Sequence, residues 1–330
     1  MLPERMAGCL LAGAVGDALG APIEFLSIQG IRQRYGPAGL TSYAPAYGRT
    51  GGAITDDTQM TLFTLEGLLL AGPEGDQVEA VRQAYLRWLE TQGGPPAEPA
   101  GRLLGIADLH SLRAPGNTCL SALRATVAGG PTGTVADPIN DSKGCGGVMR
   151  AAPAGFVSGD LRRAFALGSE IAALTHGHPS GYLPAGVLAA VVSQVLYADA
   201  SLPDALEAAA AELSRWPKHE ETTAALAAGI ALATAGRPTP ELLESLGGGW
   251  TGEEALAIAV CAALAGDDLR DALLLAVNHS GDADSTGALC GNLLGAVAGT
   301  AAIPAQWLAD LEMRDVMQDL AADAARTFSW

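Results

Sequence analysis

Residues 278–299 read NHSGDADSTGALCGNLLGAVAG and join a polar cluster to a long apolar stretch. A Ser-Gly pair precedes two aspartates, Asp282 and Asp284, and the hydroxyl of Ser285. Every fourth residue that follows is a glycine, which places these glycines on one stripe of a helix: Gly287, Gly291, Gly295 and Gly299. Because glycine has no side chain, a second backbone can approach this stripe closely. We therefore predict a buried central helix with a tightly packed neighbour.

The rest of the chain is also expected to be helical. Apolar residues recur with helical spacing along most of the sequence, and no pair of strands is recognisable. The fold class predicted is therefore all-α. Besides the two helices described next, periodic segments cover roughly residues 4–19, 58–71, 118–128, 160–174, 182–198, 204–215, 220–235, 268–278, 286–300 and 313–327.

Two further helices carry a start signal in the sequence. The spacing of a capping box, in which two side chains each bind the other's free backbone N–H, is matched by Asp76 with Glu79 and by Thr251 with Glu254. We expect these helices to extend to about Thr91 and Ala265.

The segments between helices are short and rich in glycine and proline, so none resembles a linker between domains. We expect a single domain over residues 1–330. Two stretches, 181–198 and 286–303, lack charged residues over nearly the length of a membrane span. Pro184, Gln194 and Asn292 interrupt them, and alanine-rich helices that are apolar on all faces also occur at the centre of helical proteins. We interpret both as buried helices and expect no membrane contact.

Composition limits the classes of function. The chain has 19 Lys and Arg against 36 Asp and Glu, a formal charge of −17, so the backbone of a nucleic acid would be repelled. A small anionic ligand is still compatible, because a metal ion or a helix N-terminus supplies local positive potential. The five cysteines form no CxxC pair, and Glu4 precedes the apolar N-terminal run. These features predict a cytoplasmic protein that is not exported.

A second acidic cluster, Thr55, Asp56 and Asp57, also stands directly before an apolar helix. Taken alone, it is explained by helix capping. Two such clusters also provide the carboxylate and hydroxyl oxygens that Mg²⁺ or Mn²⁺ prefers. Zinc spacings and an EF-hand loop are absent from the sequence. These residues are compatible with two interpretations, a divalent metal site and ordinary helix capping.

Three other segments contain polar residues that suit a ligand. Residues 13–22, GAVGDALGAP, lack the strand and lysine of a nucleotide loop, and Glu24 follows them. Residues 142–153, SKGCGGVMRAAP, could form a diphosphate cradle from glycine amides, Ser142, Lys143 and Arg150, or a tight turn. His176 in THGHP either interacts with a helix C-terminus or binds a ligand.

The order of these motifs resembles one family. GDALGAPIEF, YGPAG, GAITDDTQM, PGNT, SKGCGGVMRAAP, THGHPSGY, GGWTGEEALAIAV and NHSGDADSTGALCGNLLG follow one another from about Met6 to Trp307. This order is similar to that of the ADP-ribosylglycohydrolases. The resemblance implies a compact orthogonal bundle of helices and a cleft that receives ADP-ribose.

The resemblance also implies two divalent cations, Mg²⁺ or Mn²⁺, at the base of that cleft. It implies that Asp284 bridges both ions and that Glu24, Asp56 and Asp284 are catalytic, with Glu24 acting as a gate or in proton transfer. The metal ligands that it implies are Thr55, Asp56, Asp57, Asp282, Asp284 and Ser285.

The substrate contacts implied by the resemblance come from the loops. They are Gly116, Asn117, Ser142, Lys143, Gly144, Cys145, Gly146, Gly147 and His176, with Cys145 standing where some relatives carry Asn. The implied reaction releases ADP-ribose from an arginine, a serine or a similar acceptor on a protein or small molecule. Two alternatives are a catalytically silent ADP-ribose-binding or structural protein and a two-metal hydrolase of another ADP-ribose derivative. The sequence leaves the acceptor, the metal and the oligomeric state open.

Overall fold

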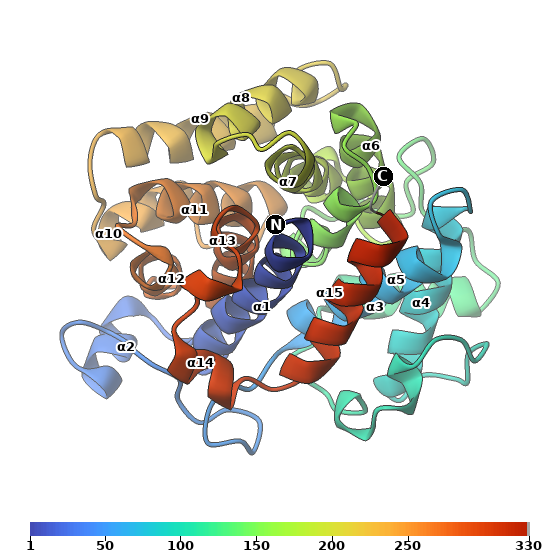
Figure 1. Cartoon of the computed structure of the whole chain (residues 1–330), viewed down its shortest axis with the longest axis horizontal. Coiled ribbons are helices and arrows are strands. Elements are labelled where there is room, and N and C mark those ends of the chain that lie inside the picture. The colour runs from blue at the N-terminus through green and yellow to red at the C-terminus, as the bar shows by residue number, and fades with distance from the viewer. Residues whose placement is uncertain (329–330) are drawn as a thin grey trace.

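Two glycine-rich helices, α1 (Leu2–Gly20) and α13 (Ala283–Ala298), pack against each other at the centre of the computed structural model, which describes residues 1–328 (Figure 1). A Cβ added to Gly16 would lie 1.9 Å from the Gly287 carbonyl oxygen, and one added to Gly291 would lie 2.0 Å from the Ala12 carbonyl oxygen. The predicted close approach of two backbones is confirmed for this stripe. Gly299 differs, because it ends α13 with a φ of +71°.

The two helices are antiparallel, which determines where the site forms. Gly8 of α1 lies beside Gly295, whereas Gly20 lies beside the backbone of Asp284 at the other end of α13. The chain that leaves α1 therefore enters the region where α13 begins.

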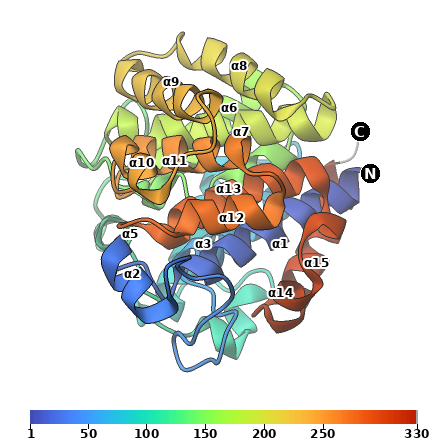
Figure 2. The same cartoon turned by 90° about the vertical axis from the view of Figure 1, so that its left-hand side faces the viewer.

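The remaining helices surround this pair in layers. In Figure 2, α8 and α9 lie outside α7 and α11, which in turn cover α12 and α13. On another side α15 and α3 pack on α1, and α4 packs on α3 (Figure 1). The helices are α2 (Ile28–Tyr35), α3 (Asp56–Ala71), α4 (Gln77–Thr91), α5 (Asn117–Val127), α6 (Leu161–Ala173), α7 (Pro179–Tyr197), α8 (Leu202–Leu213), α9 (Glu220–Thr234), α10 (Pro240–Leu243), α11 (Gly252–Ala265), α12 (Leu269–Val277), α14 (Ala305–Asp310) and α15 (Arg314–Phe328).

Short 3-10 helices complete the connections, and the described residues contain isolated β-bridges but no strand. The all-α prediction is confirmed. The 3-10 helices are η1 (Leu103–Gly105), η2 (Ala107–Leu109), η3 (Cys145–Gly147), η4 (Ala152–Phe156), η5 (Glu244–Leu246) and η6 (Thr300–Ala302).

The two predicted capping boxes are only partly present in the structure. The Asp76 side chain accepts from the Glu79 N–H, as predicted, but the Glu79 carboxylate binds Arg82 and Gln83 rather than the cap. The predicted reciprocal box at Thr251 is wrong, because its hydroxyl makes no cap bond and Glu254 accepts from the Gly248 N–H instead. The Glu254 carboxylate therefore stabilises the glycine turn that precedes α11.

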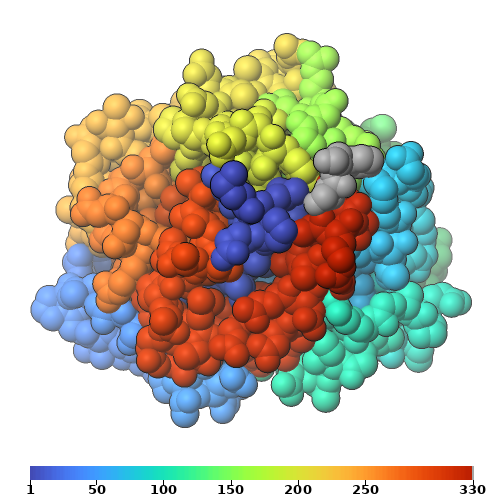
Figure 3. Space-filling model, viewed as in Figure 1, coloured from blue at the N-terminus to red at the C-terminus, as the bar shows by residue number. Residues whose placement is uncertain are grey.

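The charge-free segment of α7 is long and apolar enough to cross a membrane, but 89% of it is buried within the fold. Buried apolar residues form one cluster that extends from Met6 to Phe328. This cluster supports the single domain that we propose. Figure 3 shows the first residues of the chain emerging on one face beside the C-terminal helices.

Candidate active site

Two helices begin at the acidic clusters and direct their N-termini toward one cleft. Thr55 is the N-cap of α3 and accepts from the Asp57 N–H, and Asp282 is the N-cap of α13 and accepts from the Ser285 N–H. Helix capping, which each cluster suggested separately, is therefore present. Because helix N-termini favour negative charge, capping also holds several carboxylates close together.

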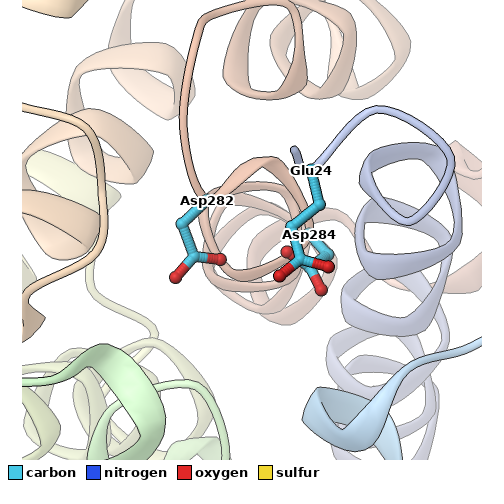
Figure 4. A group of neighbouring side chains, drawn as sticks. All are labelled: Glu24, Asp282 and Asp284. Carbon is cyan, nitrogen blue, oxygen red and sulfur yellow. The ribbon is translucent and has the colours of Figure 1, made fainter. Parts of the chain in front are cut away.

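Three carboxylates from two parts of the chain meet at the floor of the cleft. Glu24 comes from the turn after α1, whereas Asp282 and Asp284 come from the start of α13, and the three point toward one another (Figure 4). One oxygen atom from each lies within 4.8 Å of the others. The antiparallel packing of α1 and α13 produces this convergence.

Several buried carboxylate oxygens in this cluster have no hydrogen-bond partner. They are Oε2 of Glu24, Oδ2 of Asp57 and Oδ1 of Asp284. No arginine, lysine or histidine of residues 1–328 forms an ion pair with these side chains. Burying unpaired acceptors is costly unless a cation or a donor reaches them.

The electrostatics of the cluster reflect this crowding. Burial, followed by repulsion from Asp284, raises the pKa of Glu24 to about 10. The same two causes raise the pKa values of Asp56, Asp57 and Asp282 well above their ordinary range. Without a cation the cluster favours bound protons, so a cation and protons compete for these oxygens.

Asp17 positions one side of the site, and it was not among the predicted site residues. It is fully buried in α1 and its carboxylate accepts from the backbone N–H groups of Thr55 and Thr58 and from the Thr58 hydroxyl. These bonds hold the start of α3 against α1. The signal available in the sequence was a single acid inside the apolar run GAVGDALG.

A cleft of about 450 Å³ lies above the acids. The predicted residues that line it are Glu24, Asp56, Asp57, Gly116, Asn117, Gly144, Cys145, Gly146, His176, Asp282, Asp284 and Ser285. The Gly116 N–H donates to Asp56 Oδ2 at 3.1 Å, so the PGNT loop orients this carboxylate. The Cys145 thiol lies against Asp282.

Four of the predicted residues do not line the cleft. Thr55, the N-cap of α3, is fully buried. The Ser142 hydroxyl forms a hydrogen bond with the Thr118 hydroxyl. Lys143 turns outward to bind Glu221 at 2.6 Å. Gly147 faces α7, because an added Cβ would lie 2.6 Å from the Gly181 carbonyl oxygen.

The two cationic side chains named for the diphosphate cradle do not face the cleft in this structure. Lys143 is committed to Glu221 at the surface, and Arg150 is fully buried rather than exposed to the cleft. What remains at the wall is the glycine loop, held by the bond from the Cys145 N–H to the Trp250 carbonyl oxygen. Any positive potential offered to an anion here comes from backbone amides.

An exposed aromatic pair at the cleft was also missed. Phe25 is 73% exposed and Trp250 is 45% exposed, and their rings stack with centroids 5.9 Å apart. Both residues line the cleft, and Phe25 follows Glu24 directly. Neither carries a local signal, since each lies in a loop whose path depends on tertiary packing.

The donor set fits hard divalent cations. Every unpartnered atom in the cluster is a carboxylate oxygen, and carboxylates with hydroxyls are the ligands that Mg²⁺ and Mn²⁺ prefer. A buried, acidic and partly water-accessible cleft of this kind suits metal-assisted hydrolysis.

Comparisons with known proteins agree with this picture. The family described as ADP-ribosylglycohydrolase matches residues 1–330. An uncharacterized protein of Archaeoglobus fulgidus is 29% identical over 323 residues, 97% of this chain and 95% of that protein. The ADP-ribosyl-[dinitrogen reductase] glycohydrolase of Rhodospirillum rubrum is 27% identical, covering 94% and 91% of the two chains.

Two further similarities extend over the whole fold. The ADP-ribosylarginine hydrolase Tri1 of Serratia proteamaculans is 25% identical over 96% of this chain and 78% of its own. A solved structure described as an ADP-ribosylglycohydrolase-related protein complex superposes with a TM-score of 0.74, 27% identity and 99% coverage of both chains.

Proposed function

Because the chain belongs to the ADP-ribosylglycohydrolase family, whose members are enzymes, we propose that it uses divalent cations to release ADP-ribose from a guanidinium acceptor. Water joins C1 of the distal ribose, the bond from C1 to the acceptor nitrogen breaks, and the nitrogen leaves with a proton. Removal of ADP-ribose follows from the family, whereas the cations and the acceptor are our proposals.

The observation that carries the proposed metal dependence is the set of unpartnered carboxylate oxygens on Glu24, Asp57 and Asp284. In this proposal the cations are held by Thr55, Asp56, Asp57, Asp282, Asp284 and Ser285. When bound, such cations polarise the ribose oxygens and acidify water. We propose Mg²⁺ or Mn²⁺, since the unpartnered ligand atoms of the cluster are carboxylate oxygens.

The residues around the acids have separate tasks in this proposal. Glu24 lies within 4.8 Å of Asp282 and Asp284 and is our candidate for transferring a proton to or from the reacting groups, or for gating the cleft. The hydrogen bond from the Gly116 N–H fixes the orientation of the Asp56 carboxylate, so that it would face the ribose in a constant position. Of the loop amides, the Cys145 N–H donates to the Trp250 carbonyl oxygen and the Gly144 N–H donates to Ser142 Oγ, so the Gly146 N–H is our candidate for the diphosphate.

Two features favour a guanidinium acceptor over a serine hydroxyl. The stacked rings of Phe25 and Trp250 stand at the cleft next to Glu24, where the leaving group would exit. Planar guanidinium groups stack well on aromatic faces. The formal charge of −17 attracts a cationic acceptor peptide.

The proposal is tested by measuring ADP-ribose release from peptides modified on arginine or serine, with Mg²⁺, Mn²⁺ or EDTA. Asp284→Ala should abolish release, whereas Asp204→Ala, at an exposed first-turn acid of α8, should not. Release that persists in EDTA would contradict metal dependence. Tight ADP-ribose binding without release from any substrate would instead support a silent binding protein.

We also propose a cytoplasmic location. All five cysteines are free, and four of them are buried, which suits a reducing compartment. Cell fractionation with a tagged chain would test this location directly.

A further inference from the structure

Arg150 is a buried cation without a carboxylate partner among the residues that the structure describes. It is 0% exposed, and Nη1 donates to the Cys119 sulfur at 3.1 Å and the Met60 sulfur at 3.4 Å. Its Cζ lies 4.3 Å from the centroid of the Tyr85 ring. A guanidinium loses hydration when it is buried in this way, so its retention calls for an explanation beyond packing.

The shortest hydrogen bond of Arg150 leads toward the cleft. Nη2 donates to Thr175 Oγ1 at 2.6 Å. Because a guanidinium has only donors, the Thr175 oxygen must accept, and its own hydrogen is free to donate. The nearest acceptor for that hydrogen is Nδ1 of His176 at 2.8 Å, compared with the Ala172 carbonyl oxygen at 3.5 Å.

This arrangement favours one protonation state of His176. If Nδ1 accepts from Thr175, the imidazole is neutral and its hydrogen is on Nε2. Burial, together with the charge of Arg150, lowers the pKa of His176 to about 3. The ring is therefore neutral across the physiological range and presents one N–H donor.

Nε2 faces the glycine loop at the cleft wall. A Cβ added to Gly144 would lie 3.1 Å from Nε2, and one added to Gly146 would lie 3.2 Å away. His176 lines the cleft together with these two glycines. Because glycines occupy both positions, the N–H can reach a ligand held against the loop.

We propose that Arg150 is a positioning residue, which through Thr175 holds His176 as a neutral imidazole whose Nε2–H donates to an oxygen of the ADP-ribose diphosphate. This inference rests on the proposed function, because it assumes that the loop faces the diphosphate. It gives Arg150 a role without direct contact with the substrate.

The first test reads the tautomer directly. Long-range ¹H–¹⁵N spectra of histidine-labelled protein, with His176 assigned through a His176→Gln variant, should show a protonated Nε2 and a bare Nδ1. Thr175→Ser keeps the hydroxyl and should preserve this pattern. Thr175→Val has nearly the same shape but lacks the hydroxyl, so Nδ1 should gain a proton in part of the population.

The second test measures ADP-ribose affinity by titration calorimetry. Losing a hydrogen bond to a charged group should weaken binding about tenfold in Thr175→Val, whereas Thr175→Ser should stay within about twofold of wild type. Arg150→Met, which retains an apolar stem, should repeat the change in tautomer and affinity. Circular dichroism and thermal melting establish that each variant is folded, and Thr175→Val carries the test if Arg150→Met unfolds.

A wild-type His176 with its proton on Nδ1, or a folded Thr175→Val with wild-type affinity for ADP-ribose, would overturn the inference and leave the proposed hydrolysis intact. Conversely, a wild-type protein that binds ADP-ribose with the expected tautomer but releases it from no acceptor would refute only the proposed function. If the wild type failed to bind ADP-ribose, both the inference about Arg150 and the proposed function would be refuted.

Discussion

The Cys145 sulfur lies 2.7 Å from Asp282 Oδ2, and the Ser285 hydroxyl lies 3.7 Å from the same sulfur. A thiol therefore stands directly beside the oxygens proposed to hold a cation. Cys119 also lines the cleft but is fully buried and contacts Arg150, so Cys145 is the cleft thiol in contact with these oxygens. Sulfur ligands favour soft cations over Mg²⁺.

Cadmium should therefore bind at the cleft through Cys145. We expect Cd²⁺ to produce a sulfur-to-metal charge-transfer absorption in the ultraviolet and to inhibit ADP-ribose release. Cys145→Ser should lose the absorption and become less sensitive to Cd²⁺. The matched control is Cys261→Ser, which alters a buried thiol in α11. An unchanged absorption in Cys145→Ser would contradict the prediction.

Asp284→Asn should stabilise the metal-free protein while removing metal binding. Asp284 contributes to the raised pKa values of Glu24, Asp56 and Asp57, so removing its charge relieves repulsion. We expect the Tm of the EDTA-treated variant to rise by about 1–2 °C for each kcal/mol gained, because the entropy of unfolding grows with chain length. Saturating Mn²⁺ should raise the Tm of the wild type but not that of the variant. A lower Tm of the variant in EDTA would argue against charge repulsion.

The stability of the metal-free protein should fall as the pH rises. Burial raises the pKa of Asp17 from 3.8 to about 7 and that of Glu24 from 4.5 to about 10, so between pH 5 and 7 the folded state holds protons that the unfolded chain releases. Each such group lowers the unfolding free energy by at most about 1.4 kcal/mol per pH unit.

Urea unfolding in EDTA at pH 5 and pH 7, at constant ionic strength, measures this slope. Glu24→Gln should reduce the slope, because an amide does not titrate. A wild-type stability that is constant or increases over this interval would show that these two groups do not dominate the pH dependence.

Gly20→Ala should damage the site through the backbone of α13. The added Cβ would lie 2.2 Å from the Asp284 backbone nitrogen, so Asp284 must shift. We expect a loss of about 1–3 kcal/mol in stability, as for an overpacked core, and at least about tenfold weaker Mn²⁺ binding. In the control Gly30→Ala, the nearest atom lies 3.5 Å away, and a change within about 1 kcal/mol is expected. Equal Mn²⁺ affinities of Gly20→Ala and wild type would count against this account of the site.

Trp250→Leu should reduce the preference for an arginine acceptor. Loss of the aromatic face that stacks with Phe25 should lower kcat/KM for arginine-linked ADP-ribose about tenfold. The value for a serine-linked peptide should change less than threefold by the same reasoning. Leu242→Ala, at a 50% exposed residue of α10 outside the cleft, is the control. An equal loss for both acceptors would show that Trp250 supports the cleft without selecting the acceptor.

Local patterns predicted the longer helices and the two acidic helix starts, because capping and apolar periodicity act over a few residues. They missed the short helices α2, α10 and α14. They failed for Thr251, whose expected partner Glu254 instead holds Gly248. They also failed for Lys143, which finds Glu221 on a helix distant in sequence. Both errors concern polar side chains, whose partners are selected by what the fold brings near.

The sequence by itself determined that α13 would be a buried helix with a closely packed neighbour, because the spacing of Gly287, Gly291 and Gly295 is a local property of the chain. Only the tertiary structure decided that α1 is that neighbour and runs antiparallel to it. That direction brings Glu24 beside Asp282 and Asp284, and it places Asp17 under Thr55. Such contacts between distant segments depend on which backbones fit together, and no local pattern encodes that choice.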